Sequence, residues 1–262
     1  MTAQGSMNPC NTPGSFDTPS HGMKKLDMRH LITTLLFALL SAPALALTPY
    51  TAVYDAKGSG FSATNQTTLS PADSSGRIEY RATAKARGLA RLFKHDPIVE
   101  YTQFEEIDGK YQAVEYHYLF NDSGSKRNAW ILFDRDKLVA KSLYKRVTVE
   151  LDVQSDHVDR LLEQLVFRAD LMAGRVADKY LTVERNSLRE AVYEKLGAET
   201  IVTKAGSFDT VKYRRQRIGS SRSLIIWLAP ELEYLPVRLQ HFNEDKTTGT
   251  ATLKSYAITN TD

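Results

Sequence analysis

Residues 99–120 read VEYTQFEEIDGKYQAVEYHYLF, and this stretch decides the fold class. Apolar and polar side chains alternate on both sides of Asp108 and Gly109, a dipeptide that strongly favours a tight turn between two antiparallel strands. The pattern therefore predicts a β-hairpin. In its second strand we expect one face to carry Val114, Tyr116, Tyr118 and Phe120, and the other to carry Tyr111, Ala113 and Leu119.

The same period of two continues on both sides of this hairpin and is typical of half-buried antiparallel strands. No internal repeat and no low-complexity linker interrupts it, so residues 47–262 are predicted to form a single, mainly β domain. We expect further strands at residues 50–54, 61–69, 78–84, 129–133, 138–151, 179–184, 189–196, 206–215, 224–228, 236–242 and 250–258.

The period changes once, at residues 156–173, where the apolar spacing becomes that of a helix with one apolar face. Ser155 or Asp156 is a plausible N-cap, and Gly174 is placed to end the helix. A lone amphipathic helix must lay its apolar face on the sheet. The fold class predicted is a single antiparallel β-barrel or half-barrel with one amphipathic helix packed on the sheet. The apolar positions are Val158, Leu161, Leu162, Leu165, Val166, Ala169 and Met172.

The N-terminal region predicts the cellular location of the protein. Residues 23–46 (MKKLDMRHLITTLLFALLSAPALA) have a basic start, a short apolar run and a small-x-small ending, which is the pattern of a signal peptide cut after Ala46. Residues 1–22 are interpreted as a spurious or disordered leader, with Met1, Met23 or Met28 as the start. The prediction is a periplasmic protein with no membrane span after cleavage; the alternative is a disordered leader before an uncleaved anchor.

Charge and cysteine content narrow the function classes. The chain has 34 Lys and Arg against 31 Asp and Glu, interspersed, so nothing in its composition indicates nucleic-acid binding. Its one cysteine, Cys10, lies in the leader. The exported protein is therefore expected to contain no disulfide, no thiolate nucleophile and no cysteine-bound metal.

Catalytic and metal-binding motifs were not found. The histidines His95, His117, His157 and His241 lie far apart and lack the spacing of zinc ligands. The sequence contains no G-x-S-x-G elbow, P-loop or G-x-G-x-x-G loop. We therefore expect a protein that is not an enzyme, with no metal, no cofactor and no catalytic residues.

Two groups of residues are candidates for ligand binding. A cationic strand pair carries Lys212, Arg214, Arg215, Arg217 and Arg222. Lys212 and Arg214 share one strand face, and Tyr213, Arg215 and Arg217 share the other. One of these sets is expected to point inward, where an arginine must be paired or meet an anionic ligand. The chain is also rich in tyrosine and tryptophan, which are able to line a cavity. Outward ion pairs and ordinary core packing are the alternatives. The candidate ligand-binding residues are Tyr118, Trp130, Arg215, Trp227 and Arg238.

Three C-terminal segments resemble a family of exported bacterial proteins, domain-of-unknown-function family 3108. They are residues 206–213 (GSFDTVKY), 227–232 (WLAPEL) and 235–239 (LPVRL), and the likeness extends over residues 50–256. The resemblance implies an exported, mainly antiparallel β fold curved around a helix, and it supplies no catalytic residues. By analogy of fold alone, it invites comparison with periplasmic lipoprotein carriers.

These observations favour a non-enzymatic periplasmic binding or envelope-maintenance protein whose partner is a lipid or a small anionic ligand. In this hypothesis Arg215 or Arg238 meets the anionic group, while Tyr118, Trp130 and Trp227 line an apolar cavity. The first alternative is a structural domain that binds another envelope protein through an exposed face or sheet edge. The second is an envelope hydrolase with a site built from distant strands.

Overall fold

The computed structural model describes residues 47–58, 60–88, 97–122, 125–126 and 128–259. The chain divides into two compact units, Met1–Pro43 and Ala44–Asp262, and all described residues belong to the second. The predicted leader and signal peptide, residues 1–46, lie outside the described residues, so both stay predictions.

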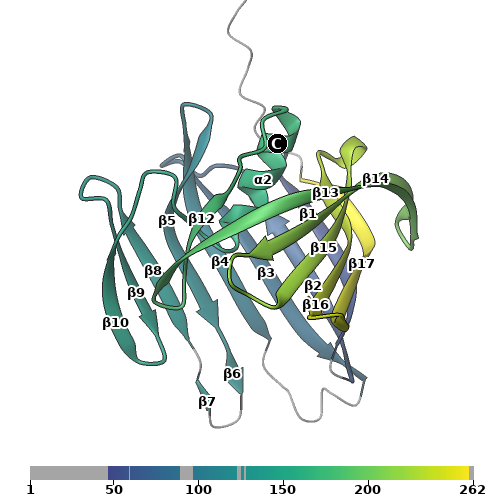
Figure 1. Ribbon diagram of the computed structural model, residues 1–262, viewed down its shortest axis with the longest axis horizontal. Helices are drawn as coiled ribbons and strands as arrows, with labels where there is room; N and C mark the ends of the chain where they lie inside the picture. Colours follow the sequence, from purple (N-terminus) through teal and green to yellow (C-terminus); the bar gives the residue numbers. More distant parts are fainter. Residues whose placement is uncertain (1–46, 59, 89–96, 123–124, 127, 260–262) are drawn as a thin grey trace, which may run out of the picture. The chain divides into compact units, whose positions relative to one another are not determined.

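One sheet of fifteen strands makes up most of this unit, and its first and last strands pair in the middle (Figure 1). From β1 (Tyr50–Gly58) the chain runs strand by strand to one end of the sheet. It then crosses to the other end and returns to β17 (Lys246–Ile258), which pairs with β1. The first half contains β2 (Phe61–Leu69), β3 (Arg77–Arg87), β4 (Ile98–Ile107), β5 (Lys110–Leu119), β8 (Ala129–Asp134), β9 (Val139–Tyr144) and β10 (Val147–Asp152).

The returning half contains the longest strands. Neighbouring strands in this half pair in antiparallel fashion, except for the short strand β11 at the end, which pairs with β12 in parallel. A separate two-stranded ladder joins β6 (Asn121–Asp122) to β7 (Ser125–Lys126). The returning strands are β11 (Val158–Asp159), β12 (Tyr180–Glu184), β13 (Ser187–Thr203), β14 (Gly206–Arg217), β15 (Arg222–Ala229) and β16 (Leu235–Asn243), with a 3-10 turn η2 (Pro230–Leu232) before β16.

The hairpin predicted from residues 99–120 is confirmed. It is formed by β4 and β5, and both turn residues have positive φ, 52° at Asp108 and 69° at Gly109. The predicted faces of β5 are wrong in one respect. The pairing shifts by one residue at Val114, so the buried face carries Ala113 and Tyr116 and the alternation is reset between them.

The helix α2 (Leu162–Met172) starts later than predicted. Neither Ser155 nor Asp156 caps it; instead the Asp159 carboxylate accepts the Leu161 and Leu162 N–H groups. Residues before Leu162 form β11 and a turn, although Val158 and Leu161 are buried as the pattern required. The predicted end is confirmed, because Gly174 follows the helix with φ 67°.

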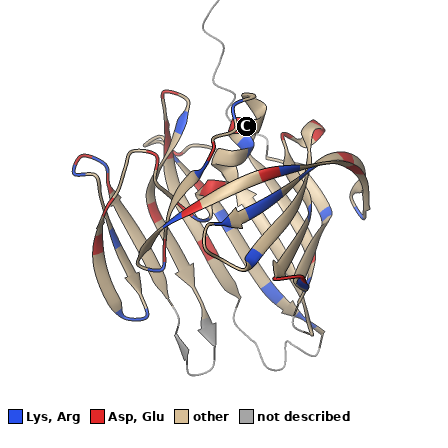
Figure 2. Cartoon of the chain, viewed as in Figure 1, with Lys and Arg blue, Asp and Glu red and all other residues tan. Residues whose placement is uncertain are grey.

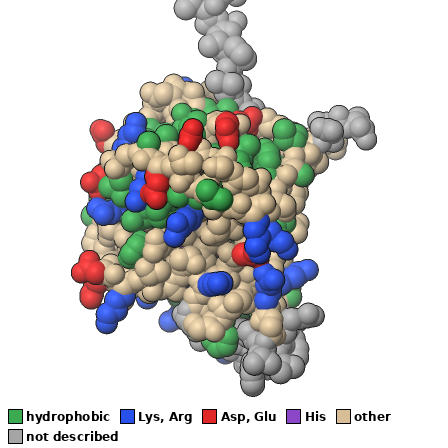
Figure 3. Space-filling model, turned by 90° about the vertical axis from the view of Figure 1, so that its right-hand side faces the viewer, with side chains coloured by type: hydrophobic (Ala, Val, Ile, Leu, Met, Phe, Trp, Pro, Cys, Tyr) green, Lys and Arg blue, Asp and Glu red, His purple; other side chains and the backbone are tan. Residues whose placement is uncertain are grey.

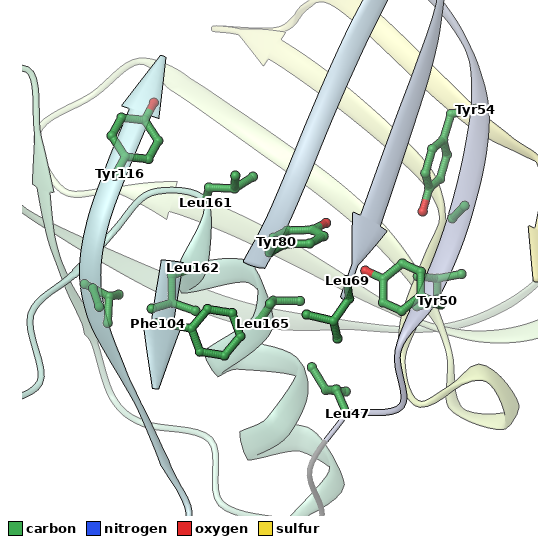
Figure 4. Packing of buried hydrophobic residues seen from close by; sticks show 14 of the residues in the cluster. Leu47, Tyr50, Tyr54, Leu69, Tyr80, Phe104, Tyr116, Leu161, Leu162 and Leu165 are labelled. Carbon is green, nitrogen blue, oxygen red and sulfur yellow. The ribbon is translucent and has the colours of Figure 1, made fainter. Parts of the chain in front are cut away.

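The helix packs on one face of the sheet, which we call the inner face. Leu162 and Leu165 lie among Phe104, Leu69 and Tyr50 (Figure 4). A second cluster forms on the other side of the helix, where the Phe167 ring stacks on Tyr193 at a centroid distance of 3.6 Å. The helix therefore fills part of the space enclosed by the two halves of the sheet.

The predicted class, mainly β with one helix on the sheet, is confirmed, but the sheet is larger than a half-barrel. In the described part of the chain, β10 and β11 are free edges, so the sheet is open. The β11–β12 end lies against the inner face of the other half: Thr102 on β4 donates to Asp159 at 2.7 Å, and Ser142 on β9 donates to Asn186 at 2.8 Å. The sheet is rolled far enough for its ends to overlap.

The far part of the β13–β14 hairpin, residues 197–211, lies over the opposite, outer face, and we call it the outer hairpin. A bulge between Lys195 and Gly197 redirects β13. The tip reaches β1, where Lys204 donates to Asp55 at 2.6 Å. Ile201 and Phe208, which belong to the hairpin, are buried in the same cluster as Trp227 and Leu253, so the hairpin covers the outer face of this part of the sheet.

Candidate functional site

The inner face is filled with large side chains near α2 and lined by small ones at its other end. Residues directly opposite in neighbouring strands share a face. Tyr50 is opposite Leu69, which is opposite Tyr80, and all three are buried. Farther along the same strands, the inner positions are occupied by small residues that are only half-buried. These are Ala56, Ala63, Ala84, Ala86 and Ala251.

A pocket of about 510 Å³ opens beside these small residues, over β14 to β17. We call it the basic pocket, because Arg215, Arg222 and His241 line it and none of the described lining residues is acidic. Pairing fixes the three on the inner face: Arg215 and His241 both lie opposite Leu224, and Arg222 lies two residues before it. Such a pocket is suited to an anionic group.

Arg215 is held in place by a buried carboxylate on the helix. Its Nε donates to Glu163 Oε1 at 2.7 Å while Nη2 donates to Oε2, and the Tyr193 hydroxyl donates to Oε1 at 3.0 Å. The Glu163 side chain is completely buried. Because both charges are taken out of water, the bidentate pair fixes the orientation of the guanidinium.

A second ion pair stands between the two ends of the sheet. Arg160 follows β11 and donates to both oxygens of Glu100 at 2.7 Å, and its Nε also contacts the Tyr116 hydroxyl at 3.1 Å. The neighbouring Asp159 is fully buried, and neutral groups donate its hydrogen bonds. Burial raises the pKa of Asp159 to about 6, although the hydrogen bonds from Thr102 and the backbone act in the opposite direction.

His241 is influenced by both arginines, Arg215 and Arg160. Its pKa is lowered, first because the surrounding protein desolvates the imidazolium and then because the Arg215 and Arg160 guanidinium groups repel its charge. Both guanidinium groups are therefore near enough to His241 to disfavour a positive charge on it. His241 is neutral at neutral pH and offers a hydrogen-bonding ring nitrogen rather than a fixed charge.

The five residues expected to bind ligand do not meet in one cavity. Tyr118 and Arg215 are on the inner face, but they line different pockets. Trp130 lies opposite His117 on the outer face. Trp227 and Arg238 are also on the outer face, opposite one another, beneath the outer hairpin. The expectation that Trp130 and Trp227 line a cavity with Tyr118 is corrected by this placement.

On the outer face, the cations near Trp227 are used within the fold. The Lys212 ammonium lies 4.9 Å and the Arg238 guanidinium 5.0 Å from the centroid of the Trp227 ring. Trp227 itself is only 4% exposed. The indole N–H donates to Glu199 at 2.9 Å. Arg238 is therefore occupied with an aromatic ring and is not in the basic pocket.

Sequence reasoning did not select Arg222, His241 or Glu163 as ligand-binding residues. Arg222 was noted only as one cation of the strand pair and His241 as a scattered histidine, because their meeting depends on the pairing of β15 with β16. Glu163 lies in the predicted helix, yet its partner Arg215 is 52 residues away. Alternation within one strand shows which residues share a face, but not which strands lie side by side.

Charge is distributed over the whole sheet (Figure 2), and acidic, basic and hydrophobic side chains are intermixed on the face seen in Figure 3. Within the described residues, no three His, Cys, Asp or Glu side chains gather in a way that would hold a metal ion. No helix in that part of the chain has the length and apolarity to cross a membrane.

A family model described as "Protein of unknown function (DUF3108)" matches residues 51–254. None of the curated proteins matches the chain. Among solved structures, the β-barrel-like protein of domain of unknown function DUF1849 from Brucella abortus aligns with a TM-score of 0.51 and 10% identity over 83% of this chain and 100% of that chain. This likeness shows a shared β-barrel-like fold.

Two further structures align more distantly. MucB aligns with a TM-score of 0.38 and 11% identity over 88% of this chain and 59% of that chain. The Pseudomonas aeruginosa MucA/MucB complex aligns with a TM-score of 0.32 and 10% identity over 80% and 51%. The chain thus spans between half and three fifths of these proteins.

Proposed function

This chain belongs to the DUF3108 family of proteins of unknown function, and from that premise we propose that it is a non-enzymatic binding protein of the bacterial cell envelope. Its ligand is an anionic amphiphile held against the inner face of the rolled sheet. The export pattern of residues 23–46 supports a periplasmic location.

The observation that carries this proposal is the basic pocket. Arg215, Arg222 and His241 converge there, and no acidic side chain is among its described lining residues. The Arg215 charge is already balanced by Glu163, which leaves Arg222 as the cation available to a ligand. A phosphate or carboxylate group would be bound by Arg222, with His241 as a neutral hydrogen-bonding partner.

The small residues on the inner face form the surface against which the apolar part of the ligand would pack. Ala84, Ala86 and Ala251 lie on the inner face and are half-buried. An alkyl chain laid along them would remove apolar surface from water, which favours binding by roughly 25 cal/mol per Å². The head group and the chain thus have adjacent sites of different chemistry.

The first experiment is native mass spectrometry of the protein purified from the periplasm, followed by titration with dodecyl phosphate and with dodecyltrimethylammonium. We expect a co-purified mass that disappears on denaturation, and saturable binding of the phosphate only. Equal binding of both detergents, or of neither, would overturn the proposal.

Matched variants locate the site. Arg222→Gln should weaken dodecyl phosphate binding by about tenfold, because one charge-assisted contact is lost. Ala84→Phe should prevent binding by filling the space for the chain. Arg238→Gln serves as the control, since it removes an arginine on the outer face and should leave the affinity unchanged.

A second function, binding of another envelope protein, is favoured by one observation. Within the described residues, β10 is the last strand at one end of the sheet, and its Val147 is 57% exposed. Apart from the Val147 carbonyl, which accepts from Asn186, such an edge can accept a strand from a partner. Photo-crosslinking from position 147 in intact cells tests this alternative. A specific crosslinked protein would support it, and labelling no greater than at an exposed position such as Lys57 would oppose it.

A further inference from the structure

We propose that the protein has a second binding site, separate from the basic pocket, which takes a single-ring aromatic carboxylate between the two overlapping ends of the sheet. We call this site the seam pocket. None of its lining residues also lines the basic pocket, so the two proposals stand or fall independently.

The seam pocket has walls from both ends of the sheet. Tyr116 and Tyr118 on β5, Ile131 on β8 and Tyr144 on β9 form one side. Val183 and Glu184, on β12, and Arg185, in the turn after it, come from the opposite end of the sheet and close the other side. A molecule in this pocket would contact two segments that no backbone hydrogen bond joins.

The volume and the lining of the seam pocket limit the shape of the ligand that it can hold. The cavity volume is about 150 Å³. An apolar cavity of roughly this volume accommodates one benzene ring. Three of its walls are tyrosine side chains, whose faces and edges pack well against another aromatic ring. A flat six-membered ring fits this space, whereas a long alkyl chain does not.

Two cations, Arg160 and Arg185, and one carboxylate, Glu184, line the pocket, so its charge balance favours an anionic ligand. The Tyr144 ring has the Lys145 ammonium at 5.5 Å and the Arg185 guanidinium at 5.7 Å from its centroid. Arg160 lies 5.5 Å from the Tyr118 centroid, but its Nε and Nη2 are held by Glu100. Arg185 and Lys145 are therefore the cations available at the mouth.

Arg185 has hydrogen-bonding capacity to spare. Its nearest carboxylate, Glu184, is 3.6 Å from Nε, beyond hydrogen-bond distance, and that carboxylate also faces Arg217 at 3.4 Å. The Arg185 side chain is 51% exposed. A ligand carboxylate at the mouth would be able to accept two parallel N–H bonds from this guanidinium.

The turn that carries Arg185 is fixed to the opposite end of the sheet. Arg185 and Asn186 have φ values of 51° and 61°, a conformation uncommon for arginine. The Asn186 side chain accepts from Ser142 and donates to the Val147 carbonyl at 2.9 Å. These contacts hold Arg185 over the pocket.

Isothermal titration with benzoate, benzyl alcohol and cyclohexanecarboxylate tests the proposal on the exported protein. We expect saturable benzoate binding at least about tenfold tighter than that of either analogue, because one lacks the charge and the other the flat ring. No saturable benzoate binding, or equal affinity for benzyl alcohol, would overturn it.

Three variants place the binding. Arg185→Gln should reduce benzoate affinity to that of benzyl alcohol, and Ala129→Phe should abolish binding by filling the cavity. Arg189→Gln, a change at an exposed arginine on β13 outside the pocket, should have no effect. Each variant must keep the melting temperature of the parent. Benzoate binding that survives Ala129→Phe in a folded protein would show that the site lies elsewhere.

Discussion

The two faces of strands β14 to β16 carry similar cations in opposite settings. On the outer face, Lys212 and Arg238 enclose Trp227 beneath the outer hairpin, and the indole N–H is bound by Glu199. On the inner face, the Arg222 cation and the neutral His241 border an open pocket whose described lining contains no carboxylate.

This difference shows that the number of cationic residues along a strand does not predict where a binding site lies. The outer cations have an aromatic partner and a covering hairpin, so their contacts stabilise the fold. On the inner face, Arg222 faces the basic pocket and has no aromatic ring or covering hairpin against it among the described contacts. The comparison predicts that changes on the outer face alter stability, whereas changes at the pocket alter binding.

The largest effect is expected from Trp227→Ala, which should lower the free energy of unfolding by about 4 kcal/mol, as large buried aromatics do. The outer hairpin would lose the ring on which it packs. Urea denaturation followed by circular dichroism measures this. Trp130→Ala is the control: that ring is half-buried and not covered by the hairpin, so less than half the loss is expected.

Glu163→Gln tests whether the inner face also contains contacts that stabilise the fold. The change leaves Arg215 with no counter-charge in a buried position, which costs about 3 kcal/mol. The double variant Glu163→Gln with Arg215→Gln should lose less than the sum of the two single variants. Strict additivity in urea denaturation would contradict the coupling.

Asp159→Asn tests the buried carboxylate whose hydrogen bonds come from neutral donors. Its pKa is about 6 in the folded protein, against about 3.9 in an unfolded chain. Between these values the folded state binds more protons, so this group lowers stability as the pH rises from about 4 to about 6, by about 3 kcal/mol in all.

The asparagine variant does not titrate, so its stability relative to the parent should improve by that amount between about pH 4 and pH 7. The new side-chain amide would keep an oxygen for the Leu161 and Leu162 N–H groups, which preserves the start of the helix. Thermal melts of both proteins across this range measure the difference. A constant difference would show that Asp159 has an ordinary pKa.

The smallest effect is expected from Lys204→Ala at the tip of the outer hairpin. The Lys204 side chain is 68% exposed, and exposed ion pairs contribute roughly 0.5 kcal/mol or less. The loss should disappear at high salt because screening already removes the attraction. A loss comparable to that of Trp227→Ala would mean that the tip, and not the packed ring, holds the hairpin.

The sequence was sufficient to predict the strands and the one helix because alternation and helical spacing are local properties. It failed where one extra residue resets the alternation, as at Val114, and where a buried turn precedes the helix, as at Asp159. The overlap of the sheet's ends, which depends on contacts such as Thr102 with Asp159, leaves no periodic pattern in the chain.

The binding site was less predictable than the fold. The alternation placed Arg215 with Tyr213, but its pairing with Glu163 required the position of the helix relative to β14. Trp227 is aromatic and adjacent to cations, which is equally typical of a ligand cavity and of a covered outer face. The bulge before Gly197, which turns the hairpin over Trp227, decides between them.

The pairing of β1 with β17 has a consequence for folding. Tyr50 lies opposite Ile258, so the middle of the sheet joins the two ends of the described chain. Each half can form its own hairpins early, but neither half has its central neighbour until the last strand arrives. Folding rates fall as contacts become more distant in sequence. We therefore expect the joining of β1 and β17 to be the slow step, during which the half-formed sheets remain open to other strands.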